Sequence, residues 1–151
     1  MVIAQERGPR TPVRQPFSGE WRLEIIRSAA EGRRITDATI ATMTAAHYPK
    51  PDQFAVDLAL EEAIANALTH GNQSDPGKRV AVLVWVDEEH VMVEVEDEGA
   101  GFDRASIPDP RVVPYLERPG GRGLLLMFRY MSWVRYNQRG NRVTLCKYRS
   151  V

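Results

Sequence analysis

Apolar residues alternate with polar ones, or follow one another in valine-rich runs, in five short segments, and such patterns predict β-strands. The segments are residues 21–26, 79–86, 91–95, 133–137 and 143–148. A polar turn at residues 87–89 separates the second segment from the third, and Arg139-Gly140-Asn141 separates the fourth from the fifth. Because short polar turns join antiparallel neighbours, we expect two hairpins.

Two helices are predicted before the first hairpin. Residues 35–46 are rich in alanine and threonine and predict the first helix, and Gly32 is expected to break the chain before it. The prolines in residues 48–51 cannot continue that helix. Asp52 is expected to cap the second helix, which ends near His70. Apolar residues recur in it at helical spacing: Phe54, Leu58, Ala65 and Leu68.

A glycine- and proline-rich stretch at residues 99–123 separates the two hairpins. Its prolines are Pro108, Pro110, Pro114 and Pro119. They exclude a long regular element over about twenty residues, and a compact domain rarely keeps such a loop without using it. Residues 124–131, directly after the loop, predict a third helix.

These elements predict an α+β two-layer sandwich. Its sheet is expected to be mixed, mostly antiparallel and built from about five strands, with the helices on one face. At 151 residues, of which 43% are hydrophobic, the chain has the size and composition of one domain with its own core. Residues 1–18 are rich in Arg, Pro and Gln and are expected to form a flexible leader, and residues 19–151 the domain.

Charge and apolar content narrow the classes of function. Lys and Arg number 20, as do Asp and Glu, so the excess of positive charge that nucleic-acid binding requires is missing and no direct nucleic-acid partner is expected. A signal-like or membrane-spanning apolar stretch is also missing, which predicts a cytoplasmic protein. The single cysteine, Cys146, has no second thiol to pair with and is expected to be buried and passive.

The first group of candidate site residues lies on the second predicted helix. Glu62, Asn66 and His70 follow one another at four-residue steps, which places them on one face of a helix. A carboxylate, an amide and an imidazole there could polarise a hydroxyl, hold a hydrated Mg²⁺ and contact phosphate. The alternative is a solvated polar stripe, which is the default for a surface helix.

The second group follows a strand, in Asp97-Glu98-Gly99-Ala100-Gly101-Phe102. The carboxylate of Asp97 could accept a hydrogen bond from an exocyclic amine such as that of adenine. Gly99 and Gly101 would let the backbone approach a flat ring, where a Cβ would collide. The alternative is a plain turn, because Asp and Gly are common turn residues.

The third group is Gly120-Gly121-Arg122-Gly123-Leu124, which leads into the third predicted helix. The free N–H groups and the positive dipole end of a helix can hold phosphates, and Arg122 adds a forked donor. The segment is neither a Walker A sequence nor a G-x-G-x-x-G fingerprint. Entry into a helix through glycine without any ligand is the alternative.

The order of the three groups along residues 62–124 resembles the GHKL ATPase and kinase superfamily. The closest likeness is to its small stand-alone members, the anti-sigma factor serine/threonine kinases of bacteria, because residues 62–67 and His70-Gly71 resemble their N-box. The resemblance runs from residue 21 to residue 147 and implies the Bergerat ATP-binding fold. No histidine-bearing dimerisation segment precedes the predicted domain, which disfavours a complete sensor histidine kinase.

The resemblance implies roles for the predicted site residues. Glu62 would be the general base that takes the proton from a protein serine or threonine, Asn66 would bind Mg²⁺, and His70 would lie beside the phosphates of ATP. Asp97 would bind the adenine amino group, assisted through water by Thr144. The other residues implied in binding ATP are Gly99, Gly101, Phe102, Gly121, Arg122, Gly123 and Leu124. Residues 102–120 would be a lid over the nucleotide.

The resemblance also implies partners. A kinase of this kind would sequester a sigma factor and phosphorylate an anti-sigma factor antagonist, and a homodimer is a further expectation. Two other functions stay open at this point. One is a non-catalytic switch in which ATP orders the lid and so selects the partner. The other is a phospho-relay component that would transfer phosphate to a histidine of its partner.

Overall fold

The computed structural model describes residue 19, residues 21–100 and residues 121–151, and for residues 121–125 it describes the backbone alone. The strands are β1 Arg22–Ile26, β2 Val80–Val86, β3 His90–Asp97, β4 Trp133–Tyr136 and β5 Arg142–Tyr148. The helices are α1 Ala29–Ala45, α2 Lys50–Asn66, the π-helical turn η1 Ala67–Gly71, and α4 Gly121–Tyr130.

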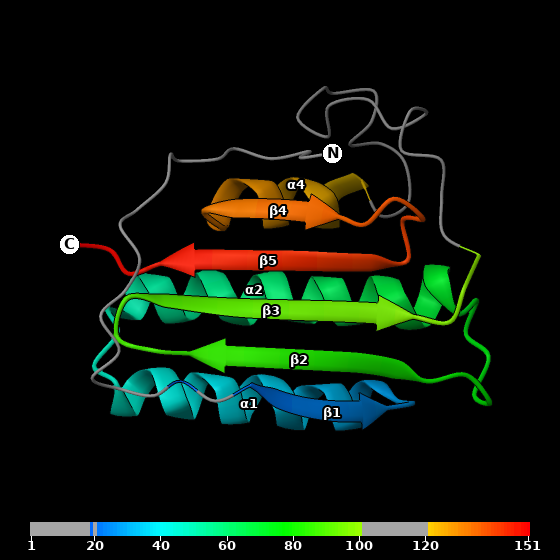
Figure 1. Ribbon diagram of the computed structural model, residues 1–151, viewed down its shortest axis with the longest axis horizontal. Coiled ribbons are helices and arrows are strands. Elements are labelled where there is room, and N and C mark those ends of the chain that lie inside the picture. The colour runs from blue at the N-terminus through cyan, green and yellow to red at the C-terminus, as the bar shows by residue number, and fades with distance from the viewer. Residues whose placement is uncertain (1–18, 20, 101–120) are drawn as a thin grey trace.

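Within this described part, the strands form one sheet in the order β1-β2-β3-β5-β4, and every neighbouring pair is antiparallel. Helices α1, α2 and α4 cover one face of the sheet (Figure 1). The predicted two-layer α+β sandwich is therefore confirmed. None of the described helices is long and apolar enough to cross a membrane.

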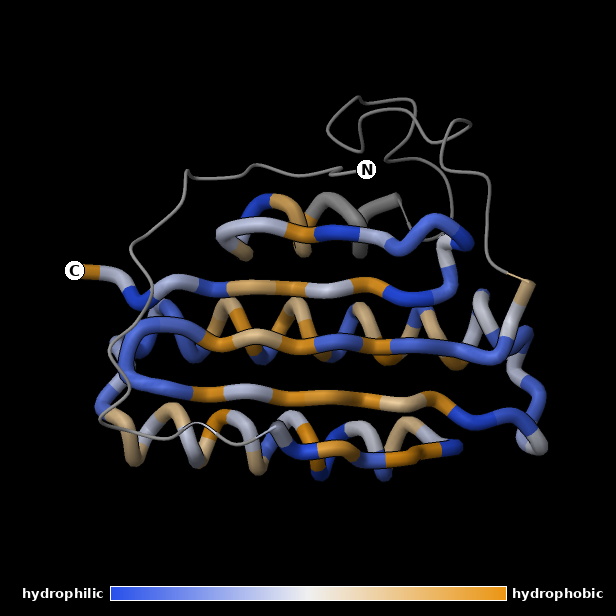
Figure 2. Tube along the Cα trace, viewed as in Figure 1, coloured by the Kyte–Doolittle hydropathy of each residue, from blue (hydrophilic) through white to orange (hydrophobic). Residues whose placement is uncertain are grey.

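The core lies between the sheet and α2. The alternate valines of β2 and β3 are buried on this side, and they pack against apolar residues of α2. Figure 2 shows the hydrophobic positions along these strands and along α2 behind them. The most deeply buried of them are Val56, Leu60, Val80, Val82, Val91, Val93 and Val95. Removing a side chain such as Leu60, which is fully buried, costs about 2–5 kcal/mol in comparable cores.

The predicted break at Gly32 is wrong, because Gly32 lies inside the first turn of α1. Ser28 caps this helix: its Oγ accepts from Glu31 N at 3.2 Å and donates to Glu31 Oε1 at 3.1 Å. A Cβ on Gly32 would lie 2.7 Å from Cγ2 of Ile64 in α2. The glycine therefore serves the close approach of two helices rather than a break between elements.

The predicted cap at Asp52 is also wrong. Helix α2 begins at Lys50 after Pro49, and prolines suit the start of a helix because its first N–H groups have no intrahelical partner. Asp52 lies within the first turn of the helix and is 1% exposed. Its carboxylate accepts from Ser150 N at 2.8 Å and Ser150 Oγ at 2.5 Å, and so ties the C-terminal residues to the start of α2.

Other boundaries differ from the predictions by a few residues. The second helix changes to the π-helical turn η1 at Ala67 before it ends at Gly71, and β3 continues beyond its predicted end to include Asp97. The third helix begins at Gly121 rather than at Leu124. The predicted leader at residues 1–18 and the whole of the predicted lid at residues 102–120 lie outside the described residues.

Candidate functional site

The end of β3, the end of α2 with η1, and the start of α4 lie at the same end of the molecule (Figure 1). Helix α4 packs along α2 in the opposite direction, because the ring of Tyr130 at its end meets the ring of Phe54 near the start of α2, with centroids 5.9 Å apart. A helix of 10 residues is about 15 Å long. Its first turn therefore lies beside the C-terminal part of α2, which carries Asn66.

Two glycines are packed so closely around Asp97 that neither can be replaced by a larger residue without movement. A Cβ on Gly71 would lie 2.1 Å from Asp97 Oδ2, and a Cβ on Gly99 would lie 2.0 Å from Gly71 O. The end of η1 and the segment after β3 are therefore in direct contact across the site. Gly99 is among the predicted site residues, whereas Gly71 is missing from them because a glycine after a helix normally indicates only its end.

The carboxyl group of Asp97 has one oxygen engaged. Gly99 N donates to Oδ1 at 2.8 Å, and no described residue donates a hydrogen bond to Oδ2. Burial raises the pKa of Asp97 above its ordinary value, while the Gly99 N–H and the positive charge of Arg139 act in the opposite direction. The group is thus a half-buried acceptor with a free oxygen, as recognition of an exocyclic amine requires.

A buried asparagine joins the end of η1 to the segment after β3. It is not among the site residues that the sequence predicts. Asn72 is 1% exposed and follows η1. Its Nδ2 donates to Arg79 O at 2.9 Å, and its Oδ1 accepts from Glu98 N at 2.8 Å. In the sequence it is one of several turn-forming residues at positions 71–77, and nothing there distinguishes it from its neighbours.

The predicted place of Thr144 is wrong. Thr144 pairs with Glu94 in the ladder between β3 and β5, and its hydroxyl lies 3.5 Å from Glu94 Oε1. Side chains alternate along a strand, so Glu94 and Thr144 face away from the helices, on the face opposite to Asp97. The β5 side of Asp97 is instead occupied by Asn141, whose Nδ2 donates to Asp97 O at 3.1 Å.

The adjacent residues Glu61 and Glu62 differ in their contacts with the described part of the chain. Arg33 of α1 bridges to Glu61, and also to Asp57 at 3.0 Å and Asp37 at 2.8 Å. Glu62 is half-buried and has no hydrogen bond or ion pair with any described residue. The bridges of Arg33 therefore distinguish the two adjacent glutamates, which the sequence alone does not.

Asn66 and His70 lie at the same end of the molecule as Asp97. Asn66 is the last residue of α2 and is half-buried, while His70 is exposed on the wider turn η1. The backbone of residues 121–124 forms the first turn of α4, whose free N–H groups are suited to anions. Gly101 and Phe102 lie outside the described residues.

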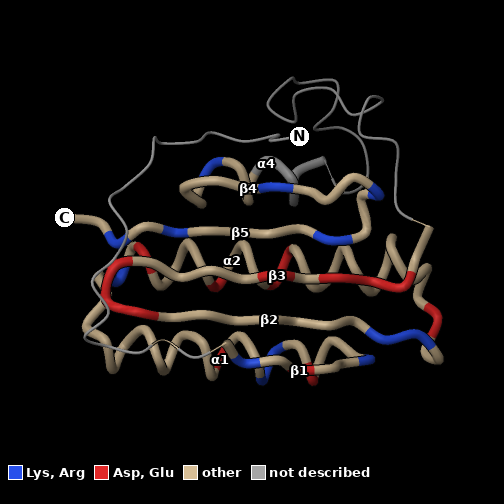
Figure 3. Tube along the Cα trace, viewed as in Figure 1, with Lys and Arg blue, Asp and Glu red and all other residues tan. Residues whose placement is uncertain are grey.

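Acidic residues dominate the last part of β3 (Figure 3). Glu94 and Glu96 project from the face opposite to Asp97, and Glu96 forms an ion pair with Arg142 at 3.6 Å.

Cys146 is buried, and burial raises the pKa of its thiol to about 12. The thiol is therefore protonated at neutral pH, as expected for a passive core residue.

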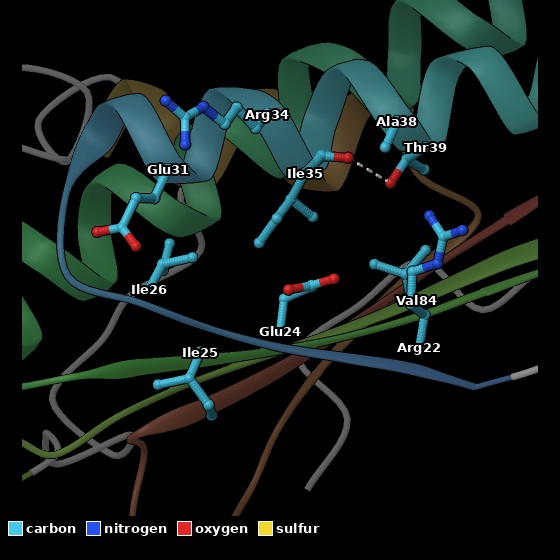
Figure 4. A pocket seen from close by; sticks show the side chains of 10 residues that line it. All are labelled: Arg22, Glu24, Ile25, Ile26, Glu31, Arg34, Ile35, Ala38, Thr39 and Val84. Atoms are coloured by element: carbon cyan, nitrogen blue, oxygen red, sulfur yellow. Dashed lines mark hydrogen bonds between the residues drawn. The ribbon is translucent and has the colours of Figure 1, made fainter.

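A separate cavity of about 190 Å³ lies between β1 and α1 (Figure 4). Its apolar floor includes Ile26 and Ile35, and charged groups stand at its rim. Of these, Arg22, Glu24 and Arg34 have no hydrogen bond or ion pair with a described residue. The cavity lies at the edge of the sheet, because β1 pairs only with β2 among the described strands.

Comparison with known proteins matches residues 23–147 to the model of the histidine kinase-like ATPase domain. Three relatives are anti-sigma F factors. The one from Geobacillus thermodenitrificans (strain NG80-2) is 30% identical over 76% of this chain and 81% of its own length. The one from Geobacillus sp. (strain WCH70) is 31% identical over 70% and 75%. The one from Clostridium perfringens (strain SM101 / Type A) is 27% identical over 85% and 93%.

Proposed function

The chain belongs to the histidine kinase-like ATPase family, in its anti-sigma factor kinase group, and from this we propose that it is an ATP-dependent serine/threonine protein kinase that also sequesters a sigma factor. The contact between Gly71 and Asp97 carries the nucleotide part of the proposal. It presents a carboxylate, whose Oδ2 accepts no hydrogen bond from a described residue, at the end of the molecule where α4 begins. The adenine amino group would donate to Asp97 Oδ2, and the phosphates would meet the first turn of α4.

Glu62 is the group best suited to act as general base. It stands one helical turn before Asn66, and it has no ionic partner among the residues that the structure describes, whereas Glu61 pairs with Arg33. In the proposed step, Glu62 takes the proton of a serine or threonine hydroxyl, the hydroxyl oxygen bonds to the γ-phosphorus, and the bond to the β-phosphate oxygen breaks to release ADP.

Asn66 would hold Mg²⁺. Its amide offers a hard oxygen ligand at a half-buried helix end, and neither its oxygen nor its nitrogen bonds to another described side chain. The ion would neutralise charge on the phosphates. His70, exposed on η1, would lie beside the same phosphates, and Arg122 with Gly121, Gly123 and Leu124 would surround them from α4. Gly101 and Phe102, which lie outside the described residues, would belong to the same proposed base pocket.

A pair of adjacent substitutions tests the kinase proposal. We expect Glu62→Ala to abolish transfer of label from γ-³²P-ATP to the antagonist protein while ATP affinity stays nearly unchanged. Glu61→Ala is the matched control, since it removes a neighbouring carboxylate that is already engaged. Equal transfer by the Glu62→Ala protein and the wild type would reject Glu62 as the base.

The same assay separates the kinase from a non-catalytic switch, in which nucleotide only selects the partner. The switch is favoured as a second candidate because Asp97 and Gly71 provide for nucleotide binding independently of Glu62. Label on a serine or threonine of the antagonist supports the kinase. ATP-dependent binding of the sigma factor or antagonist without any label supports the switch, and label on a histidine supports a phospho-relay.

The proposed partners imply a cytoplasmic location, because sigma factors act there.

A homodimer through β1 is also part of the proposal. Leu23 and Ile25 of this edge strand are 58% and 47% exposed on the face away from the helices. The opposite face carries charges of both signs beside the cavity in Figure 4, and two of them, Arg22 and Glu24, have no partner within the described part of the chain. A second copy pairing along the same strand would cover the apolar side chains and match charges of opposite sign.

A further inference from the structure

The turn between β4 and β5 makes three hydrogen bonds to residues 97–99. The backbone N–H of Asp97 donates to Asn141 O at 2.9 Å, and Asn141 Nδ2 donates back to Asp97 O at 3.1 Å. At the other end of the segment, Arg139 Nη2 donates to Gly99 O at 3.0 Å. The turn therefore holds the backbone of Asp97, which carries the proposed base-binding carboxylate, and also the carbonyl of Gly99.

Asn141 extends the sheet by one residue beyond its regular pairing. The ladder between β3 and β5 ends with Glu96 opposite Arg142, so Asp97 lies just past the last backbone pair. In a continued ladder the backbone N–H of Asn141 would donate to Asp97 O, and here the side-chain amide of Asn141 supplies that donor instead. If this side chain were removed, the carbonyl of Asp97 would lose the donor that fixes the plane of its peptide group.

The orientation of the Asn141 amide is itself fixed. Asn137 Nδ2 donates to Asn141 Oδ1 at 2.8 Å, while Asn137 Oδ1 accepts from Gly140 N and Arg142 N. Because the oxygen of Asn141 faces a donor, its nitrogen must face the Asp97 carbonyl. Asn141 is 8% exposed, and both of its amide groups are already paired. At this low exposure, and with each end of its amide already in a bond, Asn141 is better suited to hold Asp97 than to contact a nucleotide directly.

We propose that Asn141 is a positioning residue for adenine recognition, which holds the Asp97 peptide so that the carboxylate meets the amino group of the base. This inference rests on the proposed nucleotide site. Arg139 adds to the same function from Gly99, where its guanidinium also stands close enough to favour the charged carboxylate. The turn thus sets selectivity for the base through the Asp97 backbone.

The test compares ATP with purine riboside triphosphate, which lacks the amino group. We expect Asn141→Ala to weaken ATP binding by about tenfold in calorimetric titration, the scale of one lost hydrogen bond in a desolvated site, and to leave the affinity for the analogue unchanged. Gln138→Ala is the matched control, because Gln138 is an exposed residue of the same turn. Equal losses for both nucleotides would assign Asn141 a merely structural role and overturn the inference.

Arg139→Ala keeps the inference testable should Asn141→Ala fail to fold, because Arg139 is exposed. A smaller loss, about threefold, is expected for ATP and none for the analogue. Combining Asn141→Ala with Asp97→Asn should give no additional loss, since Asn141 acts through Asp97. Wild-type protein that binds ATP no better than the analogue would defeat the proposed nucleotide site. Wild-type discrimination that survives in Asn141→Ala would defeat this inference alone.

Discussion

Replacing Gly71 with alanine would place a methyl group inside the candidate nucleotide site. The new Cβ would lie 2.1 Å from Oδ2 and 2.2 Å from Cγ of Asp97. Ordinary contacts between such atoms begin at about 3.5 Å, so the carboxylate or the turn that carries it must move by about 1.4 Å. Asp97 cannot yield freely, because Gly99 N holds its Oδ1 and Asn141 holds its backbone.

Two measurable losses follow from that movement. Overpacking a well-packed site costs about 1–3 kcal/mol, which should lower the free energy of unfolding in urea titrations. A hydrogen bond to a charged group contributes about 1.5–3 kcal/mol, so loss of the bond from adenine to Asp97 should raise the Kd for ATP at least tenfold. Isothermal titration of the folded variant at a temperature well below its Tm measures the second loss separately from the first.

Gly77→Ala is the matched control. It changes a glycine of the same connection between η1 and β2, where the nearest atom to a new Cβ is Asp75 Oδ1 at 3.2 Å. We expect it to bind ATP as the wild type does. Wild-type affinity in the Gly71→Ala protein would refute the conclusion that the Asp97 carboxylate and Gly71 form part of the nucleotide site.

Three further predictions concern stability, pH and assembly. Gly32→Ala should destabilise the fold by about 1–3 kcal/mol in urea unfolding, because its Cβ would lie 2.7 Å from Ile64; an unchanged midpoint would contradict the close helix contact. Burial raises the pKa of Asp97, so its contribution favours folding below the ordinary aspartate pKa and is lost as pH rises through the raised value. The Tm of Asp97→Asn relative to wild type should therefore increase from about pH 4 to pH 7, and a difference that does not change with pH would exclude this effect. Leu23→Lys should convert a dimer to a monomer in analytical ultracentrifugation with little change in stability, whereas Phe54→Ser, at another exposed apolar residue, should not; a dimer that survives Leu23→Lys would exclude the β1 interface.

Apolar patterning predicted the sheet and α2 well because the valines of β2 and β3 are buried alternately against a single helix layer. It failed at Gly32 because glycine has two uses, as a breaker of helices and as a place where two helices touch. Only the position of Ile64 across the interface distinguishes them. Asp52 was misread for a related reason, since its partner Ser150 is far away in the sequence.

In the candidate site, too, some residues are suggested by local sequence and others depend on tertiary contacts. Asp97 and Gly99 are candidates from the sequence because the strand, the acidic residue and the glycine follow closely on one another. The residue that approaches Asp97 from β5 depends on the register between two strands, and the true register places Glu96 opposite Arg142 and so brings Asn141, not Thr144, to Asp97. Local patterns do not fix that register, nor do they show that Arg33 engages Glu61 rather than Glu62.

A crystal structure with Mg²⁺ and a non-hydrolysable ATP analogue tests the central claim most directly. We predict that the adenine amino group lies within hydrogen-bonding distance of Asp97 Oδ2, that the triphosphate meets the first turn of α4, and that the metal ion contacts Asn66. A nucleotide bound elsewhere, for example in the cavity between β1 and α1, with Asp97 and Asn66 left without contact to it, would contradict the account.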